Sequence, residues 1–115
     1  MRLLLAPHVD DEVIGCSTLL NSNIRVIYGG DVPILSPRYE EARHASVTLG
    51  YEFEMCSEDG LRGTVERNIR RYRIDTILAP DFRLECHPDH QRMGHLGWEM
   101  ARREDLRFVV YSVQM

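Results

Sequence analysis

Apolar residues gather in five short runs along the chain, at residues 3–6, 24–28, 51–55, 74–80 and 108–113. Runs of this length, rich in leucine, isoleucine, valine and tyrosine, predict β-strands that are largely buried. Between the runs, apolar positions recur every three or four residues, which is the period of an amphipathic helix. The clearest of these stripes consists of Leu61, Val65, Ile69 and Tyr72. Strands that alternate with helices predict an α/β fold.

The second predicted helix carries signals at both of its ends. Ser36 is placed to cap its N-terminus, Pro37 suits its first turn, and Gly50 can end it. The other helices are predicted over residues 11–20, 61–72 and 93–101. The resulting order favours a Rossmann-like three-layer fold, with a mostly parallel sheet of about five strands covered on both faces. The length of 115 residues predicts a single domain, 1–115.

The composition restricts the classes of function. A formal net charge of −4 argues against general nucleic-acid binding, and no apolar run approaches the roughly 20 residues of a membrane span. Every basic residue is arginine, which excludes a Schiff-base lysine and the lysine of a phosphate-binding P-loop. The three cysteines are odd in number and widely spaced, so we expect a reducing, cytoplasmic location.

The first group of residues suited to chemistry directly follows the first predicted strand. It contains His8, Asp10, Asp11 and Glu12. Three consecutive carboxylates repel one another unless a positive charge lies among them, and a divalent cation would supply that charge. His8 and Asp11 are three residues apart, so one turn of helix would bring both to the same side.

A second group, His87 and His90 on either side of Pro88 and Asp89, follows the fourth predicted strand. In a doubly wound sheet these two strands can be neighbours, and ligands collect where such strands end. Two histidines and one carboxylate form a common set of catalytic zinc ligands that leaves a position for water. The two groups together therefore predict a metal site. Spacing alone leaves open whether His87 or His90 is the ligand.

Four segments also occur in the order found in a known family. They are Pro-His-Val-Asp-Asp-Glu at residues 7–12, a helix that starts near Arg38, the turn at Asp59 and Gly60, and His-Pro-Asp-His at residues 87–90 followed by Gly94. These segments resemble the motifs of the zinc-dependent N-acetylglucosaminyl deacetylases, also called the LmbE-like or PIG-L family. The resemblance implies a minimal version of the LmbE-like fold, without the usual C-terminal extension.

The resemblance also implies a role for each matching residue. Zinc, or another divalent metal such as Fe²⁺, would be held by His8, Asp11 and His90. Asp10 would be the general base, and His87 would act as a cation or as proton donor to the leaving amine. Arg38 and Asp59 match positions that face the substrate, where they would hold sugar hydroxyls or a phosphate.

The implied function is that of a hydrolase, which removes an N-acetyl group from an N-acetylglucosamine-type amino-sugar conjugate through a zinc-activated water. The expected partner is this small molecule, and a second copy of the chain is expected to complete the cleft. The alternative is a catalytically degenerate metal- or sugar-binding module of the same fold. A nucleotide-binding domain fits less well, because the first strand-to-helix turn lacks the glycine-rich fingerprint.

Overall fold

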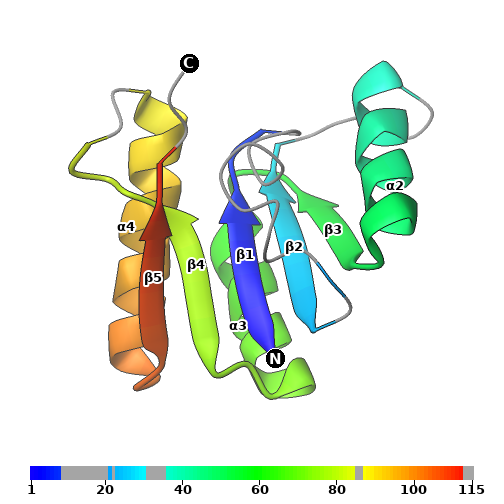
Figure 1. The fold of residues 1–115 in the computed structure, drawn as a ribbon. Coiled ribbons are helices and arrows are strands. Elements are labelled where there is room, and N and C mark those ends of the chain that lie inside the picture. The colour runs from blue at the N-terminus through cyan, green and yellow to red at the C-terminus, as the bar shows by residue number, and fades with distance from the viewer. Residues whose placement is uncertain (9–20, 22, 31–35, 85–86, 113–115) are drawn as a thin grey trace.

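The computed structural model describes residues 1–8, 21, 23–30, 36–84 and 87–112 (Figure 1). These residues contain a sheet with the strand order β3-β2-β1-β4-β5, in which every described pair of neighbours is parallel. The strands are β1 (Arg2–Ala6), β2 (Ile24–Gly29), β3 (Glu52–Cys56), β4 (Thr76–Pro80) and β5 (Arg107–Tyr111). The described helices are α2 (Pro37–Leu49), α3 (Leu61–Tyr72) and α4 (Pro88–Arg103). The helix predicted over residues 11–20 lies outside the described residues.

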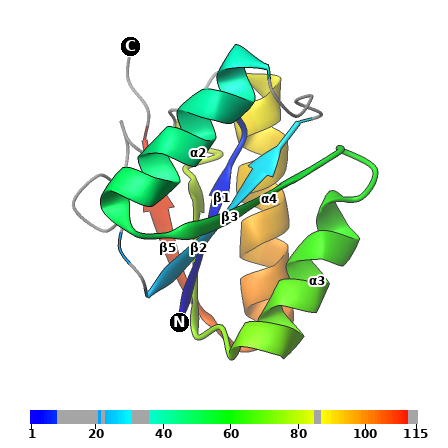
Figure 2. The same ribbon diagram turned by 90° about the vertical axis from the view of Figure 1, so that its right-hand side faces the viewer.

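The helices lie on both faces of the sheet, with α2 on one face and α3 and α4 on the other (Figure 2). Alternate residues of β1 serve the two layers: Leu4 packs in the cluster that contains Ala42 of α2, and Leu5 packs in the cluster that contains Met93 of α4. The side chains of a parallel strand alternate between the two faces, so a strand covered on both faces must be apolar throughout. The predicted Rossmann-like three-layer α/β fold is confirmed.

Both ends of α2 lie where the sequence predicts them. The Ser36 hydroxyl accepts a hydrogen bond of 3.3 Å from the backbone N–H of Tyr39, which satisfies one of the free donors of the first turn. At the other end, Gly50 has φ of 82°, a left-handed conformation that costs glycine little, and its N–H donates to the Ser46 carbonyl.

The start of α4 differs from the prediction. The sequence predicts this helix over residues 93–101, whereas α4 begins at Pro88 and has His87 as its N-cap. The His87 side chain accepts a hydrogen bond from the backbone N–H of Asp89, and Pro88 suits the first turn because it has no N–H to satisfy. The first turn of α4 is polar on its exposed side, so apolar periodicity alone places the start of the helix too late.

Two glycines let α4 approach β4 closely. A Cβ atom added to Gly94 would lie 2.3 Å from the carbonyl oxygen of Pro80, and one added to Gly97 would lie 2.8 Å from the Cβ of Ala79. The His-Pro-Asp-His segment at residues 87–90 is thus followed by a glycine, Gly94, that close packing requires. This close contact sets the position of the first turn of α4 relative to the end of β4.

A largely buried polar network joins β2 and β3 to α3. The side chain of Arg25, only 8% exposed, donates through Nε to the Asn68 amide oxygen at 2.9 Å. Asn68 in turn donates to Glu54 at 2.6 Å, and Arg67 donates to the other oxygen of Glu54 at 3.0 Å. Partial burial raises the pKa of the Glu54 carboxyl, but the hydrogen bonds from Asn68 and Arg67, together with the arginine charges, outweigh burial and lower it.

Glu54→Gln is expected to lower the free energy of unfolding at neutral pH. In acid, the difference between the variant and the wild type should disappear. Because the folded-state pKa lies below the ordinary value of 4.5, ionised Glu54 stabilises the fold above that pH. This contribution disappears as the pH falls through the folded-state pKa. Urea unfolding of both proteins between pH 3 and 7 measures the difference. Glu41→Gln, at an exposed position of α2, is the control and should change the free energy of unfolding at neutral pH by less than Glu54→Gln does. A constant difference between wild type and Glu54→Gln at all these pH values would contradict the expectation.

Candidate functional site

The strand order reverses between β1 and β4, and the candidate site lies at this point. From β1 the chain continues to β2 on one side, whereas β4 continues to β5 on the other. Connections that leave in opposite directions open a crevice beyond the carboxyl ends of the two strands, where ligands of α/β proteins collect. His8 follows the end of β1, and His87 precedes α4 after the end of β4. The topology thus brings together the two histidine-containing segments of the sequence.

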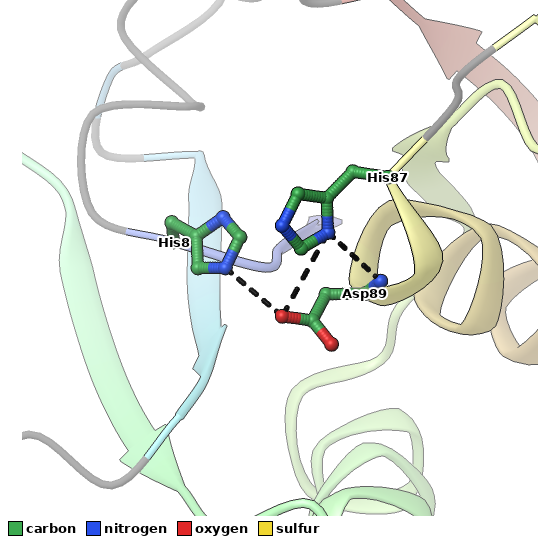
Figure 3. A group of neighbouring side chains, drawn as sticks. All are labelled: His8, His87 and Asp89. Atoms are coloured by element: carbon green, nitrogen blue, oxygen red, sulfur yellow. Dashed lines mark hydrogen bonds and ion pairs between the residues drawn. The ribbon is translucent and has the colours of Figure 1, made fainter.

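His8, His87 and Asp89 converge at this crevice (Figure 3). One carboxylate oxygen of Asp89, Oδ2, lies 3.1 Å from Nε2 of His8 and 3.9 Å from Nδ1 of His87. The two imidazole rings meet edge to face, with centroids 5.1 Å apart. One possible ligand atom from each of these three residues lies within 4.8 Å of the other two.

The third histidine of the predicted site lies beside this group. His90 is in the first turn of α4 and is only 7% exposed. Its ring centroid lies 5.4 Å from that of His8 and 5.4 Å from that of His87. The structure therefore brings His8, His87 and His90 together. The predicted ligand Asp11 and the predicted base Asp10 lie outside the described residues.

The donor atoms of this group fit a divalent cation. Ligand atoms about 2.1 Å from a tetrahedral zinc ion lie about 3.4 Å from one another. The distances of 3.1 and 3.9 Å from Asp89 to the two imidazole nitrogens are on either side of that value. Imidazole nitrogen and carboxylate oxygen are both ordinary zinc ligands. Nδ1 of His87 also accepts the backbone N–H of Asp89, so its use as a ligand would break the N-cap bond of α4.

A cavity of about 850 Å³ opens beside the group, between the ends of β1 and β2 and the helices α3 and α4. Asp89 belongs both to the group and to the wall of the cavity. The other lining residues are Pro7, Gly29, Gly30, Glu58, Leu61, Arg62, Pro88, Gln91, Arg92, Met93, His95, Leu96 and Glu99. The cavity has the size of a small-molecule site, and its lining combines apolar side chains with charged donors and acceptors.

Two ion pairs connect the α3 side of this cavity to α4. Arg92 donates through Nε to Glu58 at 2.9 Å, and its guanidinium also contacts the Asp89 carboxylate. Arg62 donates to Glu99 at 2.6 Å, and this hydrogen bond and the charge of Glu99 raise the pKa of the Arg62 guanidinium. Sequence reasoning did not identify these residues as part of the site. The only local signal is that Arg92 follows Asp89 by three residues on a helix, a spacing at which side chains meet.

The two predicted substrate-binding residues lie at different places. Arg38 is exposed in the first turn of α2, and Asp59 is exposed in the turn that precedes α3. Neither belongs to the described lining of the cavity. Asp59 directly follows Glu58, which is held to α4 by Arg92, so the turn that contains Asp59 lies at the edge of the cavity. Their roles toward a substrate stay predictions.

Comparison with known proteins supports the fold. No family model matches the chain, and no match was found among curated proteins. Among solved structures, the chain is similar to the crystal structure of GalB, the 4-carboxy-2-hydroxymuconate hydratase from Pseudomonas putida KT2440. The TM-score is 0.68 at 18% sequence identity, over 85% of this chain and 54% of the hydratase chain. The chain thus spans about half the length of that structure, and the likeness extends to the architecture alone.

The described helices include none that is both long enough and apolar enough to cross a membrane.

Proposed function

We propose that the chain is a metal-dependent hydrolase that removes an N-acetyl group from an amino-sugar conjugate of the N-acetylglucosamine type. The observation that carries the proposal is the convergence of His8, His87 and Asp89 at the crevice between β1 and β4, beside a cavity of about 850 Å³. A group of possible cation ligands with room for a small substrate next to it is the arrangement that metal-assisted hydrolysis needs.

In this proposal His8 and Asp89 hold a divalent cation, Zn²⁺ or Fe²⁺, together with His90 and the predicted ligand Asp11. The role of His90 is supported by the cap of α4, because Nδ1 of His87 already accepts the N–H of Asp89 and is less available as a ligand. When bound, the cation would supply Lewis-acid chemistry, which lowers the pKa of water and stabilises negative charge on an amide oxygen.

His87 is the proposed hydrogen-bond donor to charge that develops on the amide during the reaction. Since Nδ1 accepts a backbone hydrogen bond, the proton of the neutral ring lies on Nε2. In Figure 3 this second ring nitrogen of His87 lies on the side that faces His8. The N-cap bond fixes the orientation and the tautomer of the ring, so Nε2–H can donate a hydrogen bond to negative charge that develops on the amide oxygen. Proton transfer to the leaving amine would require the imidazolium, in which Nδ1 also carries a proton and no longer accepts the N–H of Asp89. Asp10, the predicted general base, completes the proposal.

The cavity is the proposed place of the sugar. Its wall offers arginine donors and carboxylate acceptors at Arg62, Arg92, Glu58 and Glu99, which suit a ligand with many hydroxyl groups. The odd number of cysteines supports action in the cytoplasm. A second copy of the chain that completes the cleft stays part of the proposal.

Metal analysis and an activity assay test this function together. We expect the purified protein to bind about one zinc ion per chain and to release primary amine from at least one of a panel of N-acetylglucosamine conjugates. Asp10→Asn should keep the metal and lose roughly 10²- to 10⁴-fold in turnover, because that is the usual contribution of a general base. Bound zinc without turnover by the wild type would support the metal- or sugar-binding module instead. A wild type that takes up no divalent cation would refute the proposal.

A further inference from the structure

Arg92 connects the wall of the cavity to the candidate metal group. Its guanidinium contacts one oxygen of Asp89, Oδ1, and its Nε donates to Glu58 at 2.9 Å. The other oxygen of Asp89, Oδ2, lies 3.1 Å from Nε2 of His8. A continuous series of polar contacts therefore runs from Glu58 through Arg92 and Asp89 to His8. Among the described residues that line the cavity, Asp89 and Arg92 are the two that take part in this series on the α4 side.

Glu58, at the end of this series away from His8, lies in a turn that backbone hydrogen bonds hold in place. The backbone N–H of Gly60 donates to the carbonyl of Ser57 at 3.1 Å, and that of Leu61 donates to the carbonyl of Glu58 at 3.3 Å. These bonds fold residues 57–61 into a turn that leads directly into α3. Glu58 is thus presented from a defined backbone position. Arg92 bridges from this turn to the first turns of α4.

The Asp89 carboxylate needs such a support. Its side chain is 38% exposed, so solvent can compete for its oxygens. A cation ligand has to present one oxygen in a fixed direction, and an outer hydrogen-bond donor on the second oxygen is the usual means of holding it. Arg92 is such a donor, because it contacts Oδ1 and leaves Oδ2 toward His8 and His87.

We propose that Arg92 is a positioning residue for the cation site, which holds Asp89 in its ligand orientation by bridging it to Glu58. The inference rests on the proposed metal-binding function. Arginine suits this role because its planar fork can donate to two carboxylates in fixed directions at once, whereas the ammonium of lysine is a single point charge. The turn before α3, which contains the predicted substrate residue Asp59, thereby becomes part of the support of the metal.

The test measures cation affinity directly. Zn²⁺ affinity is determined by competition with a chromophoric chelator, and the visible spectrum of the Co²⁺-loaded protein reports the ligands. Arg92→Met should weaken Zn²⁺ binding about tenfold, which is the usual effect of losing an outer partner of a ligand, and should change the Co²⁺ spectrum. Arg92→Lys should weaken binding as well, because one ammonium cannot bridge both carboxylates. Glu58→Ala should act in the same direction, with a smaller effect.

Glu99→Gln is the matched control. It breaks the other arginine–glutamate pair of the same cavity, and its position is ten residues beyond Asp89, which is about 15 Å along α4. We expect Zn²⁺ affinity and the Co²⁺ spectrum of this variant to equal those of the wild type. Thermal unfolding of each metal-free variant shows whether the fold is intact.

Each other outcome overturns a distinct claim. Unchanged affinity in Arg92→Met would overturn the positioning role and leave the metal site standing. Wild-type affinity in Arg92→Lys would show that positive charge alone suffices and would overturn the bridging role. An equal loss of Zn²⁺ affinity in Glu99→Gln would show that any disturbance of the cavity weakens binding, and would overturn the specific role of Arg92. Absence of Zn²⁺ binding by the wild type would instead overturn the proposed function on which the inference rests.

Discussion

On the proposed function, His8→Ala is expected to abolish cation binding and, with it, hydrolytic activity. His8 lies at the end of β1 and faces all the other members of the group, with ring centroids 5.1 Å from His87 and 5.4 Å from His90. It belongs to every ligand set proposed for the cation. The loss of an inner ligand should exceed the roughly 10- to 100-fold in affinity that the loss of an outer partner costs. Elemental analysis and a Zn²⁺ titration of the purified variant measure the effect.

The control for this variant is His44→Ala, which removes an exposed histidine from α2. It should bind zinc as the wild type does. The His8 side chain is 43% exposed, so the metal-free His8→Ala protein should unfold at nearly the same temperature as the metal-free wild type. Retention of one tightly bound zinc by His8→Ala would show that the cation lies elsewhere.

Gly94→Ala is expected to have the largest effect on stability. A Cβ atom at this position would lie 2.3 Å from the Pro80 carbonyl oxygen and 3.0 Å from the Cβ of Phe82. The first contact is with backbone, which cannot move aside by changing a rotamer, so α4 would have to shift away from β4. Overpacking of this kind costs about 3 kcal/mol in the free energy of unfolding. Urea unfolding of the variant measures this loss.

Gly63→Ala provides the matched comparison for this prediction. Gly63 lies within α3, and a Cβ atom added there meets no atom within 4 Å beyond its chain neighbours and the backbone of its own helix. The same substitution should stabilise the protein by up to about 1 kcal/mol, because alanine is the better helix former. If Gly94→Ala lowers the free energy of unfolding and Gly63→Ala raises it, the effect of close packing is separated from that of helix propensity. Equal stability of Gly94→Ala and the wild type would mean that α4 is not packed on β4 as described.

The architecture could be predicted because its signals are local. Ser36 and Gly50 end α2 through contacts made within a few residues, and these predictions are confirmed. The apolar stripe that begins at Leu61 gives α3 its correct limits for the same reason. The predicted start of α4 was wrong because its first turn is polar, with His87 as the cap and Asp89 in the turn. There, polar side chains occupy positions that periodicity expects to be apolar.

The site itself was only partly predictable. The meeting of His8 and His87 follows from the topology, since both come after strands that a doubly wound sheet makes neighbours. The contact of Glu58 with Arg92 does not follow, because it depends on how the turn before α3 and the side of α4 face each other across the cavity. The sequence does not indicate that two surface charges far apart along the chain form a pair. Such a contact can be identified only from the three-dimensional structure.

The place of β1 in the sheet has a consequence for the order of folding. β1 lies between β2 and β4, and its pairing with β4 joins residues separated by most of the chain. Contacts between such distant residues form late, since closing a long loop costs more entropy than closing a short one. The segment from β1 to β3 can pair locally first, whereas His8 meets His87 only after β4 has docked. If the proposed cation site is correct, metal binding during refolding should therefore appear together with this last step of sheet assembly.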